Sequence, residues 1–176
     1  PVTGAVTGTM TGAAARPTEL PFTELQRLAP SIRVELRYAT TNNFTGKVLY
    51  PPEARCYLRA SVAEALAAVA TALQAEGLGL KLFDCYRPQR VQFQLWELVH
   101  DERYVASPHK GSRHNRGAAV DLTLVDQDGR ELPMPTPFDD FTEKAHRSYQ
   151  DLPEEAKRNR ARLEQAMVRA GFVGLP

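Results

Sequence analysis

The sequence predicts an α+β fold, in which helices pack on a small and mainly antiparallel β-sheet. Short stretches of alternating apolar and polar residues indicate strands, and longer stretches with apolar residues three and four positions apart indicate helices. The order in which these stretches follow one another along the chain favours the α+β class. A length of 176 residues and an apolar fraction of 43% fit one domain with a sizeable core.

The domain is expected to follow a leader. Residues 1–19 are mostly Gly, Thr, Ala, Val and Pro without a sustained period, which indicates a flexible leader or linker. The ordered domain is expected over 20–176. Apolar and charged residues alternate over 32–36 and predict a half-buried strand. The stretch 40–47 is rich in residues that favour turns, and we expect a loop there.

A first long helix is expected from Ser61, because Ser61 and Glu64 have the spacing of a capping box. Its buried stripe would consist of Leu66, Val69, Ala70 and Leu73. Gly77 is a plausible end for this helix. Leucines alternate over 78–84, which predicts a strand that ends at Asp84.

A second helix is expected from Pro88, because proline fits the first turn of a helix. Its apolar face would consist of Val91, Leu95, Trp96, Leu98 and Val99. A polar loop is expected over about 101–116, and loops of this length between core elements often have a function.

The last third of the chain begins with an apolar run through Asp121, which predicts a buried strand, and Asp128-Gly129 marks a tight turn after it. A final helix is expected from Pro153 to Gly171, since acidic residues in its first turn suit the positive end of the helix dipole. Residues 172–176 resemble the approach to another strand.

The charge balance excludes several classes of function. Net charge is +1, with 22 basic and 21 acidic residues, so electrostatics predict neither nucleic-acid binding nor attraction to an anionic membrane. No apolar run approaches the roughly 20 residues that a membrane span requires. No obligate protein partner is evident.

Cys56 and Cys85 are too few for a disulfide scaffold, and two buried thiols are favoured over one disulfide.

The segment from Ser112 to Leu124 carries the first candidate site. Asp121 lies among apolar residues, where a carboxylate is costly unless it is paired or binds a metal. His114 precedes it, and Gly117 between them permits a tight turn. A His and an Asp brought together in this way suit zinc. The simpler interpretation, a loop histidine and a hydrogen-bonded carboxylate, remains open, because two ligands alone are a weak signal.

The segment from Asp84 to Pro88 is the second candidate, since it joins a strand end to a helix. Arg87 could stabilise a developing oxyanion, or it could only tie down the loop by pairing with Asp84. Cys85 could be a reactive thiol, although no motif associates a His–Asp pair with it.

At this point the residues resemble a known family. The pattern Ser112-x-His114-x-x-Gly117-x-Ala119-x-Asp121 is similar to the zinc motif of the D-alanyl-D-alanine dipeptidases, which include the vancomycin-resistance dipeptidase. The resemblance extends over roughly 22–176, through Leu36–Thr40, Asn43–Lys47, Asp84-x-Tyr86-Arg87-Pro88, Asp121–Leu124, Phe138-Asp139 and the final helix to Gly171-Phe172. It implies a fold shared with zinc D,D-carboxypeptidases and the Hedgehog signalling domain.

The resemblance also implies roles for single residues. His114 and Asp121 would bind Zn²⁺, and Arg87 would stabilise the tetrahedral intermediate. Ser112 would help to hold the dipeptide, with Tyr38, Phe44 and Asp139 as further substrate-binding residues of the pocket.

Family members also carry a Glu-x-x-His segment after the last helix, which supplies the third ligand and the general base. We expect both beyond Pro176, in a C-terminal segment that the sequence lacks. Replacement of the third ligand by His109 or His146 is an alternative.

The resemblance therefore implies a zinc metallopeptidase that hydrolyses D-Ala-D-Ala or a similar D,D-dipeptide, within peptidoglycan metabolism or glycopeptide resistance. Two alternatives remain: a D,D- or L,D-carboxypeptidase that acts on peptidoglycan stems, and a non-catalytic zinc- or cell-wall-binding module. The start at Pro1 and the Thr/Gly-rich leader lean towards a periplasmic or exported protein, with a cytoplasmic location still open.

Overall fold

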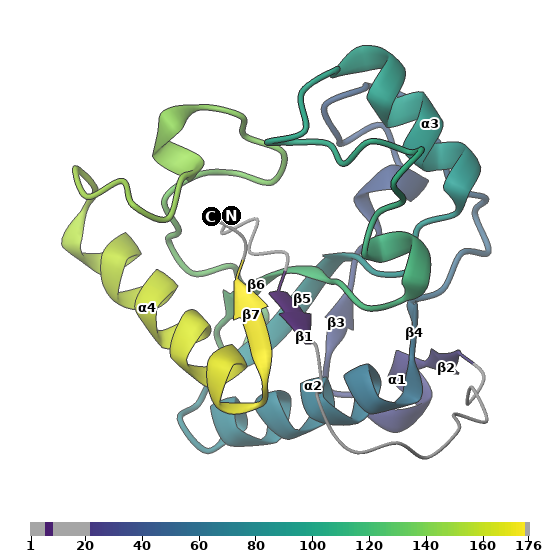
Figure 1. The fold of residues 1–176 in the computed structure, drawn as a ribbon. Helices are drawn as coiled ribbons and strands as arrows, with labels where there is room; N and C mark the ends of the chain where they lie inside the picture. Colours follow the sequence, from purple (N-terminus) through teal and green to yellow (C-terminus); the bar gives the residue numbers. More distant parts are fainter. Residues whose placement is uncertain (1–5, 9–21, 175–176) are drawn as a thin grey trace.

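A three-stranded sheet forms the centre of the computed structural model, which describes residues 6–8 and 22–174 (Figure 1). The strand order is β3 (Arg33–Val34), β5 (Gly79–Asp84) and β6 (Asp121–Val125). The strands β5 and β6 pair antiparallel, whereas β3 runs parallel to β5. The α+β class is confirmed, with a mixed sheet at its centre.

Helices surround this sheet. They are α1 (Leu25–Leu28), α2 (Ala60–Gln74), α3 (Gln89–Leu98) and α4 (Glu154–Arg169), with short 3₁₀ helices η1 (Arg37–Ala39), η2 (His114–Arg116) and η3 (Glu143–Ala145). The helix α2 packs against β5 and α4, and α4 also contacts β6. In Figure 1, α3 lies away from α2 and α4. None of the helices in the described ranges is long and apolar enough to cross a bilayer.

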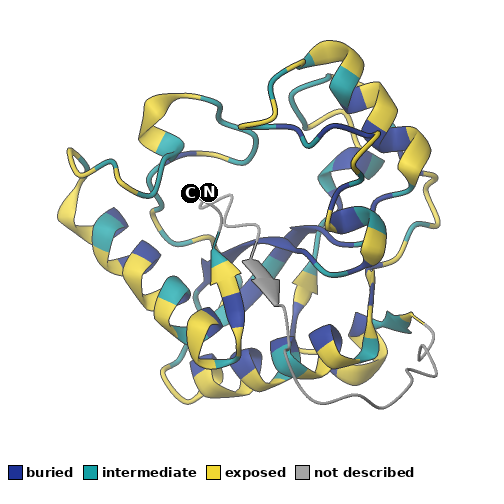
Figure 2. Ribbon diagram, viewed as in Figure 1, coloured by how far each residue is buried: buried dark blue, intermediate teal, exposed yellow. Residues whose placement is uncertain are grey.

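The core lies between the sheet and these helices. Figure 2 shows β6 and most of β5 as buried and the outer faces of the helices as exposed, whereas the short strand β3 is exposed to half-buried. The predicted stripe of α2 is confirmed, because Leu66, Val69, Ala70 and Leu73 are all buried. In α3, Val91 and Leu95 are buried, but Leu98 is 55% exposed. The apolar face predicted for α3 was therefore too wide.

Two short antiparallel pairs lie outside the central sheet: β1 (Val6–Gly8) with β7 (Phe172–Gly174), and β2 (Thr23–Glu24) with β4 (Tyr57–Leu58). The strand expected after the last helix is thus present as β7. Apart from β1, the leader expected over 1–19 lies outside the described residues.

Two local predictions were wrong. The helix α2 begins at Ala60, and its N-cap residue Arg59 makes no side-chain capping bond, so Ser61 and Glu64 do not form a capping box. Regular pairing of β3 covers only 33–34, because the chain turns into η1 immediately after Leu36. Capping and strand pairing both depend on where neighbouring segments lie, and the local pattern did not contain that information.

The prediction of two free thiols was also wrong. Cys56 and Cys85 form a disulfide with a Cα–Cα distance of 5.4 Å, and both are buried. Apolar burial suits thiols and disulfides equally well, so burial did not discriminate between them. Cys56 immediately precedes β4 and Cys85 immediately follows β5, and the Tyr86 amide next to Cys85 donates to the Tyr57 carbonyl next to Cys56 at 3.1 Å, so the cysteines meet although they are 29 residues apart.

We expect loss of this disulfide to lower the free energy of unfolding by about 3–4 kcal/mol, because the crosslink restricts the unfolded chain across a loop of this length. Denaturant unfolding with and without a reductant measures the difference. A Cys56→Ala/Cys85→Ala variant is the matched control, since it should not respond to the reductant. An unchanged midpoint for the reduced wild-type protein would contradict the expectation.

Candidate metal centre

The two predicted ligands meet at the edge of the central sheet. His114 opens η2, and Asp121 is the first residue of β6. Gly117 ends η2 with φ +62°, a left-handed conformation that returns the chain towards the strand. A Cβ at Gly117 would lie 2.2 Å from the ring of Phe22, so glycine is required here for space as well as for conformation. Both ligands are buried.

The His114 imidazole is oriented by a backbone carbonyl. Its Nδ1 lies 2.8 Å from the carbonyl oxygen of Cys85, and because that oxygen can only accept, Nδ1 carries the proton. The unprotonated Nε2 then faces Asp121, at 3.6 Å from Oδ1. Tetrahedral zinc places two such ligand atoms about 3.3 Å apart. The pair therefore fits a zinc ion, with the tautomer that a metal-binding histidine commonly has.

The charges of this pair also favour a cation. Burial is the largest single influence on His114 and opposes its imidazolium, but the charge and hydrogen bond of Asp121, together with the charge of Asp84, outweigh it and raise the His114 pKa. Burial acts against the Asp121 carboxylate as well, yet the facing His114 and the nearby Arg87 lower its pKa overall. A buried carboxylate thus stays ionised beside an imidazole that attracts a positive charge. A metal ion can take the place of the proton that the raised pKa favours on the imidazole of His114.

A second acidic residue, Asp84, lies in the same cluster, and ligand atoms of Asp84, His114 and Asp121 fall within 4.8 Å of one another. The register of the sheet causes this, since Asp84 and Asp121 are paired residues of β5 and β6. However, Oδ1 of Asp84 accepts bonds from Tyr50 Oη and the Cys85 amide, and Oδ2 accepts two from Arg87. With both oxygens occupied, Asp84 is better suited to hold Arg87 than a metal.

Arg87 is buried beside the two ligands. Its Nε and Nη2 bond Asp84 at 2.9 and 2.7 Å, and its Nη1 bonds Gln92 at 3.0 Å. The pairing with Asp84 that the sequence allowed is thus present. It does not exclude a role in catalysis, because the guanidinium has five N–H groups and these bonds use three of them. Nη2 also lies 3.7 Å from Oδ2 of Asp121, which places the guanidinium beside this ligand.

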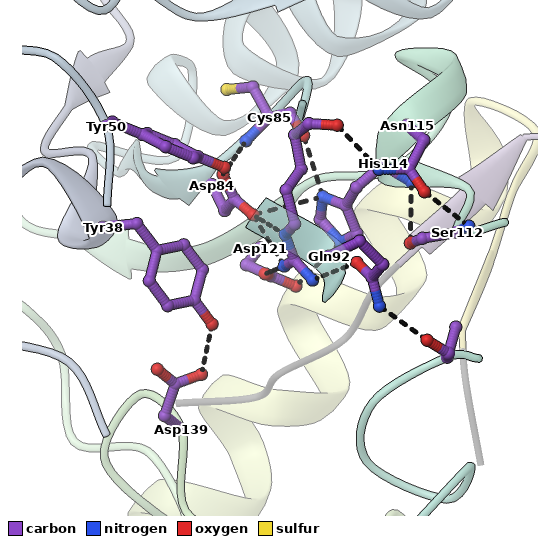
Figure 3. A network of polar contacts seen from close by, with 12 residues as sticks. Tyr38, Tyr50, Asp84, Cys85, Gln92, Ser112, His114, Asn115, Asp121 and Asp139 are labelled. Carbon is purple, nitrogen blue, oxygen red and sulfur yellow. Dashed lines mark hydrogen bonds and ion pairs between the residues drawn. The ribbon is translucent and has the colours of Figure 1, made fainter. Parts of the chain in front are cut away.

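A second polar group adjoins the metal centre. Tyr38 donates to Asp139 at 3.2 Å, and the Arg87 guanidinium lies over the Tyr38 ring at 5.2 Å from its centroid. The amide of Phe44 approaches the other Asp139 oxygen at 3.5 Å. Figure 3 shows Tyr38 and Asp139 on one side of the group formed by Asp84, Asp121 and His114. The predicted pocket residues therefore lie together.

Asp139 is held in an unfavourable state. Burial and the charge of Asp121 raise the pKa of its carboxyl to about 7, and its φ is +61°, the only positive value among the described residues other than glycine. Both features cost stability, and costs of this kind concentrate at functional sites.

We expect Asp139→Asn to stabilise the metal-free protein at pH 8. The carboxyl pKa is higher in the folded protein than in the unfolded chain, so folding loses stability as pH rises from about 4 to about 7. The amide, which is always neutral, avoids this loss. The gain at pH 8 should be on the order of 2 kcal/mol, allowing for partial exposure.

Denaturant unfolding of both proteins at several pH values measures this difference. It should disappear below pH 4, where the carboxyl is neutral in both states. An equal difference at pH 4 and pH 8 would contradict the shifted pKa.

Of the other residues named from the sequence, Ser112 lies at the site, whereas His109 and His146 lie outside it. Ser112 is buried, and its hydroxyl oxygen accepts a bond from the His114 amide at 3.2 Å, so its own O–H is still available to a substrate. His109 is exposed and packs on Phe93, whereas His146 packs near Tyr104. Neither histidine belongs to the cluster of potential metal ligands found among the described residues.

Several contacts of the site were not predicted from the sequence. Gln92 bonds Arg87, Tyr50 bonds Asp84, and the Asn115 side chain donates to the Arg87 carbonyl at 2.7 Å. The Arg87 amide in turn donates to the carbonyl of His114 at 3.1 Å. The last two bonds hold the segment with Arg87 against the segment with His114. The one available signal was the presence of polar residues at apolar positions, as for Gln92 on the buried face of α3.

A buried His–Asp pair spaced for zinc, with an arginine beside it and the hydrogen-bonded Tyr38–Asp139 pair next to it, suits a zinc-dependent hydrolase on this α+β fold. The peptidase M15 family model, described as D-ala-D-ala dipeptidase, matches residues 18–176. The chain belongs to this family, whose peptidases are zinc enzymes.

Individual relatives agree with the family match. The chain is 42% identical over 156 residues to the D-alanyl-D-alanine dipeptidase of Escherichia coli (strain K12), an alignment that covers 87% of this chain and 80% of the relative. It is 33% identical to the D-alanyl-D-alanine dipeptidase of Enterococcus faecium, with 88% and 86% covered. The D-alanyl-D-alanine dipeptidase of Streptomyces coelicolor is 32% identical, with 86% and 85% covered.

Proposed function

We propose that this protein is a zinc dipeptidase that hydrolyses D-Ala-D-Ala or a similar short D,D-dipeptide. The observation that carries the proposal is the buried pair of His114 Nε2 and Asp121 Oδ1, 3.6 Å apart, with Arg87 against it. The D-alanyl-D-alanine dipeptidases among its relatives support the substrate. Such an activity belongs to peptidoglycan metabolism or glycopeptide resistance.

His114 and Asp121 would hold the zinc ion. When bound, zinc polarises a carbonyl and activates water, which is the chemistry that peptide hydrolysis needs. Arg87 contributes two donors that its bonds to Asp84 and Gln92 leave over, and these would stabilise the negative charge on the carbonyl oxygen. Because Asp84 and Gln92 already hold the guanidinium, little reorganisation is needed when that charge develops.

Asp139 would bind the ammonium group of the dipeptide. It is a carboxyl group beside the metal centre, and burial and the charge of Asp121 raise its pKa to about 7, because Arg87 offsets them only in part. A positively charged amino group would supply that partner. Tyr38 fixes the carboxylate through its hydroxyl, Phe44 borders the same space, and Ser112 offers its O–H from the opposite segment. A free amino end next to the scissile bond is a property of dipeptides.

Substrate comparison tests the proposal. Purified full-length protein loaded with zinc should hydrolyse free D-Ala-D-Ala, leave L-Ala-L-Ala intact, and act poorly on a stem pentapeptide that ends in D-Ala-D-Ala. Preference for the pentapeptide would instead support a D,D-carboxypeptidase. Absence of hydrolysis of all three, with zinc bound, would support a non-catalytic module.

We also propose an oxidising compartment for this protein, such as the periplasm or the exterior. The support is the buried Cys56–Cys85 disulfide, since structural disulfides persist where thiols are not kept reduced. Alkylation of thiols in acid-quenched cells tests this. Modification of both cysteines without prior reduction would contradict it.

A further inference from the structure

Gln92 is a buried polar residue in the first turn of α3, and both ends of its amide are bonded. Its Oε1 accepts a bond from Arg87 Nη1 at 3.0 Å, and its Nε2 donates to the Ala106 carbonyl at 2.7 Å. The side chain is wholly inaccessible to solvent. Gln92 therefore connects the arginine of the site to the loop after α3.

The orientation of this amide follows from its partners. A guanidinium can only donate, and a backbone carbonyl can only accept. If the amide were turned over, its NH₂ would face Arg87 and its oxygen would face Ala106, and both contacts would be repulsive. The arrangement with Oε1 on Arg87 is thus the one that satisfies both neighbours.

Arg87 is fixed on three sides. Asp84 binds Nε and Nη2 along one edge, the ring of Tyr38 lies across the face, and Gln92 holds Nη1 at the far end. Without Gln92, Nη1 would be a buried donor without this acceptor, and the guanidinium could pivot about its bonds to Asp84. A pivot would move the two spare donors, and a small displacement of such donors is costly for catalysis.

We infer that Gln92 is a positioning residue for catalysis, which acts by aiming the Arg87 guanidinium at the carbonyl oxygen of the substrate. The inference rests on the proposed function of Arg87 and deepens it. The side-chain hydrogen bonds of Gln92 go to Arg87 and Ala106, so Gln92 would act through Arg87.

The chain offers a matched control in Gln89. This residue lies one turn earlier on the same helix, and its Nε2 donates to the Pro108 carbonyl at 2.6 Å, in the same loop. It makes no bond to Arg87. Methionine at either position keeps the approximate side-chain volume and removes the hydrogen bonds. Both variants therefore lose a tie to the loop, but only Gln92→Met releases Arg87.

The experiment measures zinc content, unfolding midpoint, kcat and KM for D-Ala-D-Ala in full-length Gln92→Met, Gln89→Met, Arg87→Ala and the Gln92→Met/Arg87→Ala double variant. For Gln92→Met we expect kcat to fall roughly 10- to 100-fold, with KM and zinc content nearly unchanged. Gln89→Met should retain wild-type kcat. The double variant should be no slower than Arg87→Ala, because Gln92 acts through Arg87.

Each alternative outcome has a distinct meaning. Equal losses of kcat in Gln92→Met and Gln89→Met, or additive losses of kcat in the double variant, would overturn the inference. Gln92 would then only stabilise the loop after α3. An unchanged kcat in Arg87→Ala would instead remove Arg87 from the proposed mechanism. If Gln92→Met does not fold, Gln92→Glu decides, since it keeps an acceptor for Arg87: retained kcat supports the inference, and a loss as large as in Arg87→Ala overturns it.

Discussion

Replacing Asp121 with alanine is expected to abolish stoichiometric zinc binding, because the variant retains only His114 of the two described ligands. Loss of an outer contact of a metal site weakens affinity about 10- to 100-fold, and loss of a ligand should exceed that. Hydrolysis of D-Ala-D-Ala should fall to background. Metal analysis after dialysis, together with competition against a chelator, measures the affinity.

The structure indicates that this variant will fold. Arg87 keeps its bonds to Asp84 and Gln92 when Asp121 is removed, so no buried charge loses its main partner. Asp128→Ala is the matched control, since Asp128 lies in the exposed turn after β6 and pairs with Arg130 at the surface. Full zinc content in Asp121→Ala would overturn the assignment of the metal centre.

Replacing Arg87 with alanine is expected to lower kcat about 100- to 1,000-fold while zinc remains bound, since Arg87 is not a ligand and the loss falls on stabilisation of the oxyanion. The same change should reduce the free energy of unfolding by about 3–5 kcal/mol, because the buried Asp84 loses its charged partner. The kinetics must therefore be measured at a temperature well below the unfolding midpoint of the variant, alongside metal analysis.

Two further variants separate charge from geometry at Arg87. Arg87→Lys retains a positive charge for Asp84 but cannot form the forked pair. Compared with Arg87→Ala, its free energy of unfolding should therefore recover more than its kcat. Arg103→Ala removes a surface arginine that pairs with Asp101, and we expect no change in turnover. Wild-type kcat in Arg87→Ala, with zinc bound and the protein folded, would show that the oxyanion is stabilised elsewhere.

The approach of the two proposed ligands was predictable because they lie within one short segment. His114 and Asp121 are separated by a single turn, and Gly117 signals that turn in the sequence. An ionisable residue within an apolar run then marks the position where the turn enters the sheet. Residue identity, spacing and a glycine were sufficient to predict that the two side chains meet, since the geometry of so short a segment is set locally, whereas zinc itself was implied by the resemblance to the dipeptidases.

Contacts between distant segments were not predictable in the same way. Tyr38 and Asp139 are 101 residues apart, and the sequence alone gave no distance between them. Cys56 and Cys85 were taken for free thiols, because a buried thiol and a buried half-cystine have the same apolar surroundings. Gln92 was passed over as one polar residue on a helix.

The sequence by itself determined the α+β class, the main helices, the turn of the metal centre and, through its resemblance to the dipeptidases, the family. Only the tertiary structure decided that Asp84 and Gln92 hold Arg87, that Tyr38 holds Asp139, and that the cysteines pair. The reason is physical: periodicity and turn residues act through neighbouring positions, whereas the partner of a buried polar group depends on how the whole chain packs.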